Sequence, residues 1–197
     1  MNYLAHIYLS GNDNTVTVGN FMADGIKGKD YLEYSKAIQI GILLHREIDT
    51  FTDAHPIVRL STKRLHKKYS HYSGIIVDIL YDHFLAKNWK HYCDIPLEDY
   101  TVKFYDMLDN HYDILPTRIK KMMPYMIADN WLLSYASIAG ISKVLDGMNR
   151  RTNNKVKMDQ AVFELEAFYN EFEQEFTAFF EELITFSQHK LKQLTSL

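Results

Sequence analysis

The sequence predicts an all-α protein that folds as a single-domain helical bundle. The chain of 197 residues has only 8 glycines and 4 prolines, too few for the many turns of a β protein. Apolar residues recur at three- and four-residue steps along most of the chain, as they do on one face of a helix. Aromatic residues make up 14% of the chain and suit helix–helix packing. The length favours one domain over residues 1–197.

Helical segments with recognisable ends follow one another through the first half. A short apolar segment opens the chain, the second segment stops at Gly28, and the third begins at Ser35, a residue type that suits an N-cap. Pro56 marks the next start, because proline is favoured at the first helical position. The expected segments are 3–9, 16–27, 35–51, 56–69 and 74–89.

The second half ends in the most regular pattern of the chain. Segments are expected at 97–110 and 116–126, followed by shorter pieces to residue 149 and a linker at 150–155. Over 158–197, phenylalanine and leucine recur on one face and glutamate occupies most of the other. This pattern predicts one long C-terminal amphipathic helix, about 45 Å in length.

Composition and charge exclude several classes of protein. The net charge of −3 disfavours a purely electrostatic nucleic-acid binder. The one cysteine, Cys93, rules out an internal disulfide and a multi-cysteine zinc site. No apolar run approaches the roughly 20 residues of a membrane helix, and the first residues do not read as a secretory signal. We therefore expect a cytoplasmic protein with no nucleic-acid or membrane partner, and leave its oligomeric state open.

A first candidate site lies in the segment 35–51. His45 and Asp49 are four residues apart, so they share one face of a helix at the edge of its apolar arc. An imidazole and a carboxylate in this position can bind one cation. They can equally form a hydrogen-bonded pair at the edge of the core.

A second candidate site lies in the segment 74–89. Asp78 and Asp82 are again four residues apart, and His83 follows directly. Two carboxylates beside a buried strip are costly unless they are paired, protonated or bound to a metal.

A third and weaker signal surrounds residue 24. Asn20 and Asp24 share a helical face, and Lys27 at the end of that segment either binds a phosphate or complements the helix dipole. Three segments thus offer carboxylates or imidazoles at a buried edge, which suits a metal site inside a helical bundle. Mixed Asp and His ligands favour Mn²⁺, Mg²⁺ or Fe²⁺ and hydrolysis of a phosphoester.

Several unusual strings in residues 1–150 resemble one family, the acyl carrier protein phosphodiesterases. The matching strings are Met1-Asn2-Tyr3-Leu4-Ala5-His6, Gly19-Asn20-Phe21-Met22-Ala23-Asp24 with Lys27-Gly28, Gly41-Ile42, His45-Arg46-Glu47-Ile48-Asp49, Thr52-Asp53, Asp78-Ile79-Leu80-Tyr81-Asp82-His83-Phe84-Leu85, Asn130-Trp131-Leu132 and Val144-Leu145-Asp146-Gly147-Met148. The resemblance implies an HD-like fold and an enzyme that removes the 4'-phosphopantetheine arm from holo acyl carrier protein, with Mn²⁺ as its metal.

The resemblance also implies roles for residues, although the adjacent pair Asp82-His83 reverses the usual His-Asp order of HD proteins. The expected metal ligands are Asp24, His45, Asp49, Asp78, Asp82 and His83. Arg46 or Lys27 would offset charge on the phosphoryl oxygens. His6 would protonate the leaving serine or orient a ligand.

The expected partner is acidic, so basic clusters are candidate docking surfaces. The first candidate is formed by Lys63, Arg64, Lys67 and Lys68. Further candidates are Lys120 with Lys121 and Arg150 with Arg151. Two other functions stay open: an HD-like phosphohydrolase of a nucleotide or other small phosphoester, and a non-catalytic helical binding protein.

Overall fold

The computed structural model describes residues 1–196, and these contain helices and turns but no strand. The α-helices are α1 (Tyr3–Tyr8), α2 (Asn14–Met22), α3 (Lys36–Ala54), α4 (Pro56–Tyr69), α5 (Ser73–Lys87), α6 (Leu97–Asn110), α7 (Thr117–Ala128), α8 (Trp131–Ser134), α9 (Ile138–Arg151), α10 (Ala161–Ala167) and α11 (Tyr169–Thr195). Short 3-10 turns are η1 (Ala23–Gly25), η2 (Asp30–Glu33), η3 (Ser70–Tyr72), η4 (Trp89–His91), η5 (Tyr112–Ile114) and η6 (Met158–Gln160). The predicted all-α fold class is confirmed.

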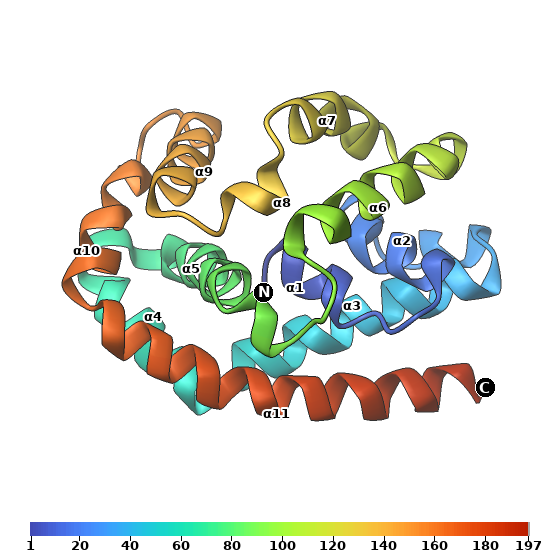
Figure 1. Ribbon diagram of the computed structural model, residues 1–197, viewed down its shortest axis with the longest axis horizontal. Coiled ribbons are helices and arrows are strands. Elements are labelled where there is room, and N and C mark those ends of the chain that lie inside the picture. Colours follow the sequence, from blue (N-terminus) through green and yellow to red (C-terminus); the bar gives the residue numbers. More distant parts are fainter. Residues whose placement is uncertain (197) are drawn as a thin grey trace.

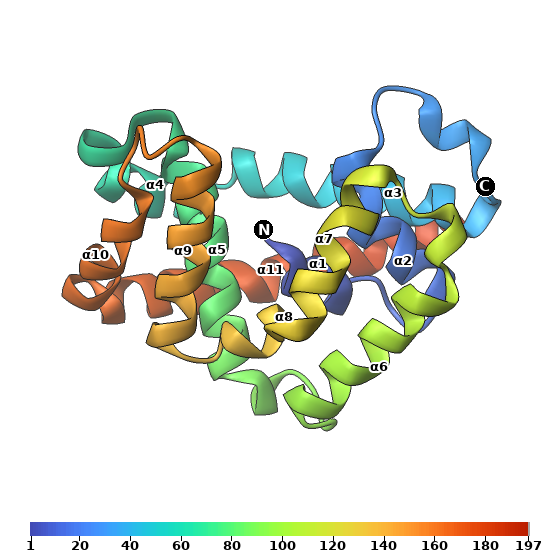
Figure 2. The same cartoon turned by 90° about the horizontal axis from the view of Figure 1, so that it is seen from above.

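The helices surround the short N-terminal helix. In Figure 1, α11 runs along the bottom, α1 and α5 lie in the middle, and α6 to α9 lie above them. Helix α11 packs against α3, α4 and α5, while α1 contacts α2 and α5. Figure 2 shows the N-terminal end of the chain near the centre of the molecule, between α5 and α2. Buried apolar side chains from nearly every helix form one hydrophobic cluster.

Local sequence explains where several helices begin. The Asp13 carboxylate accepts hydrogen bonds from the backbone amides of Thr15 and Val16 and so caps α2. Ser137 caps α9 in the same way. Helix α4 has Pro56 at its first position, as expected, because the missing amide hydrogen needs no partner there.

Two glycines bring α2 and α3 into close contact. A Cβ atom at Gly19 would collide with the backbone carbonyl of Ile38, and one at Gly41 with the carbonyl of Val16. Larger residues would therefore push these helices apart. This crossing holds the end of α2 against the middle of α3, where two of the predicted sites lie.

The predicted helix over 158–197 is present but interrupted. Phe168 leaves the helical conformation, so that α10 packs against α9 while α11 packs against α3 and α4. One straight helix could not contact both. The expected linker also starts later, because Arg150 and Arg151 complete α9 and the turn follows at Asn153 and Asn154, both with positive φ. No helix in residues 1–196 has the length and apolar character needed to cross a bilayer.

Candidate metal centre

A cavity of about 940 Å³ separates the N-terminal helices from α7, α8 and α9. One side is lined by polar side chains of α1, α3, α5 and η1, among them His6, Asp24, His45, Asp49, Asp53 and Asp78. The other side carries four cations, Arg118 of α7 and Lys143, Arg150 and Arg151 of α9, against two carboxylates, Asp129 and Asp146. Aromatic and aliphatic side chains such as Phe21, Ile75, Trp131, Tyr135 and Val144 complete the wall. The cavity thus has an acidic side, a basic side and an apolar lining.

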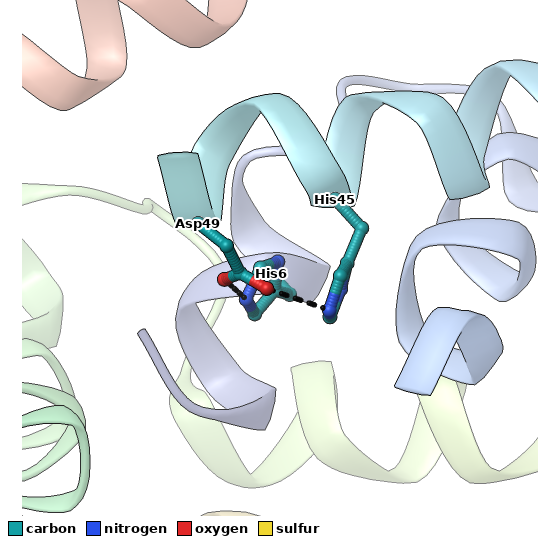
Figure 3. Close-up of side chains that lie close together, drawn as sticks. All are labelled: His6, His45 and Asp49. Atoms are coloured by element: carbon teal, nitrogen blue, oxygen red, sulfur yellow. Dashed lines mark ion pairs between the residues drawn. The ribbon is translucent and has the colours of Figure 1, made fainter. Parts of the chain in front are cut away.

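His6, His45 and Asp49 converge at the acidic side of this cavity. Each residue offers one possible ligand atom, and the three atoms lie within 4.8 Å of one another. Figure 3 shows His6 from α1 facing His45 and Asp49, which both come from α3. The two imidazole rings are stacked with centroids 3.9 Å apart. One carboxylate bridges them: Asp49 Oδ1 is 3.2 Å from His6 Nε2, and Asp49 Oδ2 is 3.1 Å from His45 Nε2.

Asp24 extends the cluster from the 3-10 turn that follows α2. Its Oδ1 atom lies 3.4 Å from His45 Nε2. The hydrogen bond from His45 lowers the pKa of Asp24 below its ordinary value, although burial opposes the change. Asp24 and Asp49 therefore share the same ring nitrogen of His45.

The two histidines have opposite pKa shifts. Burial, assisted by the neighbouring charge of His45, lowers the pKa of His6 to about 4. Burial also acts to lower the pKa of His45, but hydrogen bonds to Asp24 and Asp49 outweigh it and raise the pKa to about 9. Burial acts to raise the pKa of Asp49, but the hydrogen bond from His45 and the nearby imidazole charge outweigh it and hold that pKa well below the ordinary range. At neutral pH the cluster therefore holds one charged and one neutral imidazole.

His6 Nε2 is the atom that tests whether a cation fits. It is fully buried and has no hydrogen-bond partner, although a carboxylate oxygen lies 3.2 Å away. A buried polar atom without a partner is destabilising. Imidazole nitrogens and carboxylate oxygens are ligands for Mn²⁺, Fe²⁺ and related cations. The donor set and the unpartnered nitrogen both fit a divalent cation.

The second predicted cluster is divided between two environments. Asp78 lines the cavity, and its Oδ1 atom is 3.0 Å from the amino nitrogen of Met1. Asp82 is fully buried and accepts hydrogen bonds from the backbone amides of Leu4 and Ala5, at 2.7 and 3.3 Å. It thereby caps the first turn of α1. Burial raises the pKa of Asp82 to about 7, against the opposing effect of these amides.

His83 lies outside the cavity. Its Nδ1 atom is 2.7 Å from the carbonyl oxygen of Tyr135, and its Nε2 atom is 2.8 Å from the hydroxyl of Tyr169. Both ring nitrogens therefore have a protein partner. The side chain projects about 100° around α5 from Asp82, toward α8 and α11 instead of α1.

The predicted phosphate-binding residues also lie away from the cavity wall. The Arg46 guanidinium donates to the carbonyl of Ile26 and lies over the ring of Tyr31, so it holds the loop before α3. Lys27 is exposed in that loop and is absent from the cavity lining. The arginines that do line the cavity are Arg118, Arg150 and Arg151, and Arg150 is paired with Asp146 at 2.9 Å. The sequence signal for Arg118 is weak, because α7 and α3 are far apart along the chain.

The predicted docking cluster lies on α4, which does not line the cavity. The Arg64 guanidinium pairs with Glu175 through two hydrogen bonds of 2.8 and 2.7 Å, and Lys68 pairs with Glu164 at 2.7 Å. Two of its four cations thus attach α4 to the C-terminal helices. Glu164 and Glu175, on the glutamate-rich face of the C-terminal segment, are thus held in ion pairs.

An all-helical fold with acidic and imidazole side chains facing arginines across a cavity is typical of a hydrolase of phosphoesters, and comparison with known proteins agrees. The family model described as "Acyl carrier protein phosphodiesterase" matches residues 1–183. The chain belongs to the acyl carrier protein phosphodiesterase family, which confirms the resemblance seen in the sequence.

Curated relatives match over nearly their whole length. The protein named acyl carrier protein phosphodiesterase from Yersinia enterocolitica is 32% identical over 191 residues, which is 96% of this chain and 99% of the relative. The Serratia proteamaculans protein of the same name is 30% identical over 98% of this chain and its own full length. One from Escherichia coli is 27% identical over 96% of this chain and 99% of its own. No solved structure is significantly similar.

Proposed function

We propose that this chain hydrolyses the phosphodiester that links 4'-phosphopantetheine to holo acyl carrier protein. Water adds to phosphorus, the bond to the carrier serine oxygen breaks, and that oxygen takes up a proton to give the apo carrier protein and free 4'-phosphopantetheine. Membership of the family supports the reaction. The observation that carries the proposal is the convergence of His6 Nε2, His45 Nε2 and the Asp49 carboxylate on the wall of a large cavity.

These three residues would hold a divalent cation, with Asp24 and Asp78 as further carboxylates on the same side of the cavity. We propose Mn²⁺, with Mg²⁺ or Fe²⁺ as alternatives, because the donor set mixes imidazole nitrogen with carboxylate oxygen. Such a cation activates a water molecule and polarises a phosphoryl oxygen. Asp82 and His83 are less suited as ligands. Asp82 caps α1, and both ring nitrogens of His83 already have hydrogen-bond partners. The relation to HD-type enzymes stays a prediction.

The remaining residues of the cavity suit the other needs of the reaction. Arg118 and Arg151 face the acidic side and would bind the non-bridging phosphoryl oxygens. This role replaces the one predicted for Arg46 and Lys27. The apolar lining, with Trp131 and Val144, would pack against the pantetheine arm and exclude water.

His6 is better suited to ligation than to proton donation. With its pKa lowered to about 4, its ring is neutral near pH 7 and holds a single hydrogen. That hydrogen lies on Nδ1, which faces the amide oxygen of Asn20 at 2.9 Å, so Nε2 has a lone pair to offer and no proton to deliver.

Two basic surfaces are candidates for docking the acidic carrier protein. The arginines and lysine of α7 and α9 line the cavity itself, so a protein bound there would place its arm at the cluster. The α4 cluster of Lys63, Arg64, Lys67 and Lys68 stays a prediction, and two of its members are already paired with glutamates. We propose that the α7–α9 surface makes the larger contribution.

Intact-protein mass spectrometry of holo acyl carrier protein tests the reaction. Incubation with this chain and Mn²⁺ is expected to remove the mass of the whole arm, and a chelator is expected to prevent the loss. Arg46→Ala is a matched control, because Arg46 lies near the cluster but not on the cavity wall. An unchanged mass with Mn²⁺ bound would favour another phosphoester as substrate. An unchanged mass with no Mn²⁺ bound would favour a non-catalytic protein.

A further inference from the structure

Asn20 is a buried polar residue that the predicted site does not include. It lies near the end of α2 with no exposed surface, directly beneath the two stacked histidines. Its Oδ1 atom is 2.9 Å from His6 Nδ1 and 3.2 Å from His45 Nδ1. Its Nδ2 atom donates to the carbonyl oxygen of His6 at 3.0 Å and to Ser10 Oγ at 2.9 Å. All the polar atoms of one side chain are therefore used.

The surroundings of Nδ2 determine which way the amide points. The carbonyl oxygen of His6 can only accept a hydrogen bond. The Ser10 hydroxyl donates its own hydrogen to that same carbonyl, at 2.7 Å, so its oxygen is left to accept from Asn20. Both partners at this end require a donor. The amide nitrogen must lie there, and the amide oxygen must face the imidazoles.

The oxygen in turn determines where the two histidines carry hydrogen. An amide oxygen only accepts, so His6 and His45 must each have a hydrogen on Nδ1. A neutral imidazole has one N–H, so His6 has its lone pair on Nε2, and His45 has one there once a cation displaces its Nε2 proton. These are the two nitrogens that lie 3.2 and 3.1 Å from the oxygens of Asp49.

We propose that Asn20 is the positioning residue of this centre: one carboxamide fixes the tautomer of both histidines, so that both Nε2 lone pairs point at one cation. The inference rests on the proposed metal centre and adds the residue that prepares it. Partners beyond the ligands commonly orient metal-bound histidines, and one partner that serves two rings couples their orientations. The close crossing at Gly19 and Gly41 places Asn20 within reach of α3.

Three variants separate this role from simple packing. Asn20→Ala removes the acceptor, and His6 is then expected to move its hydrogen to Nε2, where Asp49 is the nearest acceptor. Asn20→Asp keeps an acceptor for both Nδ1 atoms but loses the donor that the His6 carbonyl and Ser10 Oγ require, so it tests the acceptor alone. Ser10→Ala is the matched control, because it removes one contact of Nδ2 and leaves Oδ1 in place.

The first measurement is the histidine tautomer, from nitrogen-15 NMR of the metal-free protein near pH 7. The wild type, Ser10→Ala and Asn20→Asp are expected to show His6 with hydrogen on Nδ1, and Asn20→Ala to show it on Nε2. Hydrogen on Nε2 of His6 in the wild type would overturn the proposal. Because the wild type alone decides this point, the test holds even if Asn20→Ala does not fold.

The second measurement is Mn²⁺ affinity by titration calorimetry. Asn20→Ala is expected to bind Mn²⁺ about 10- to 100-fold more weakly. Ser10→Ala is expected to stay within about threefold of wild type, and Asn20→Asp to bind Mn²⁺ more tightly than Asn20→Ala does. Equal weakening in folded Asn20→Ala and Asn20→Asp would mean that Asn20 acts by packing. Neither measurement uses the carrier protein. A wild type with the expected tautomers and affinity but no loss of the arm would contradict the proposed function and leave this inference standing.

Discussion

Two regions of this molecule gather ionisable side chains between helices, and they differ in how the charges are balanced. Where α4 and α5 meet α11, two glutamates each pair with a cation of the chain: Glu175 with Arg64 and Glu173 with Lys87. At the cavity wall, Asp24 and Asp49 both turn to the same histidine, and His6 Nε2 has no partner. The first arrangement is complete within the chain and the second is not. A cluster of ionisable groups in which one polar atom lacks a partner is therefore a better sign of a binding site than the number of charges.

The largest effect is expected from removing the shared carboxylate of the incomplete region. Asp49→Ala is predicted to reduce kcat/KM more than about 100-fold, since substitutions that merely reorient a ligand already cost 10- to 100-fold. The variant should also lose the rise in Tm that Mn²⁺ gives the wild type, because a cation that binds only the folded state stabilises it. Differential scanning fluorimetry with and without Mn²⁺ checks this. An unchanged rise in Tm would exclude Asp49 as a ligand.

The second prediction concerns pH. The pKa of His45 is raised to about 9 from 6.5, so its proton stabilises the metal-free protein fully below about pH 6.5, and this contribution is lost as pH rises through about 9. A cation must displace that proton, so Mn²⁺ affinity is predicted to rise about tenfold per pH unit within this window. Calorimetric titrations at pH 6.5, 7.3 and 8.0 measure the slope. Asp24→Asn removes a negative charge that favours the protonated ring and should flatten the slope. A wild-type affinity independent of pH would contradict the assignment.

The third prediction compares arginines inside and outside the cavity. Arg118→Ala and Arg151→Ala are each expected to lower kcat/KM about tenfold or more, because a hydrogen bond to a charged group contributes about 1.5–3 kcal/mol. Arg46→Ala and Lys27→Ala should stay within about threefold of wild type, since neither lines the cavity. Steady-state kinetics on holo acyl carrier protein distinguish the pairs. A larger loss of kcat/KM in Arg46→Ala or Lys27→Ala would instead support the phosphate-binding role that the sequence predicts for these two residues.

The smallest effect on catalysis is expected in the balanced region. Arg64→Ala breaks a two-bond pair with Glu175 and a contact with the ring of Phe172, so unfolding should become easier by about 1–3 kcal/mol. Urea denaturation measures this loss, and KM for the carrier protein is expected to change less than twofold. A large rise in KM with unchanged stability would instead support docking on α4.

The sequence predicted the site correctly where the geometry of a single helix determines which residues lie together. The spacing of His45 and Asp49 predicts a shared face, and the structure joins them at 3.1 Å. It could not determine which helix each face would meet. Asp82 and His83 are adjacent, yet one caps α1 and the other bonds Tyr135 and Tyr169, because successive residues leave a helix in different directions.

Contacts between distant segments account for the other differences. The resemblance gives His6 the role of an acid or of a residue that orients a ligand. Nothing local to α1 indicates that α3 places the ring of His45 against that of His6. The spacing of Asn20 and Asp24 predicts a shared helical face. The contact of Asn20 with both histidines instead depends on the close crossing of α2 and α3. The break at Phe168 is explained in the same way by a distant contact. Helix α10 packs against α9, whereas α11 turns away to pack against α3 and α4.

The cap that Asp82 provides for α1 has a consequence for the order of events in folding. Helix α1 spans only six residues, and a helix of that length does not persist in water by itself. It is held by a carboxylate 78 positions later along the chain, in the middle of α5. We therefore expect His6 to be held against Asp49 only after α5 has been made and has docked. A ribosome-bound chain that ends before α5 would lack this centre, so the capacity to bind a cation matures with the tertiary structure and serves as a marker of its completion.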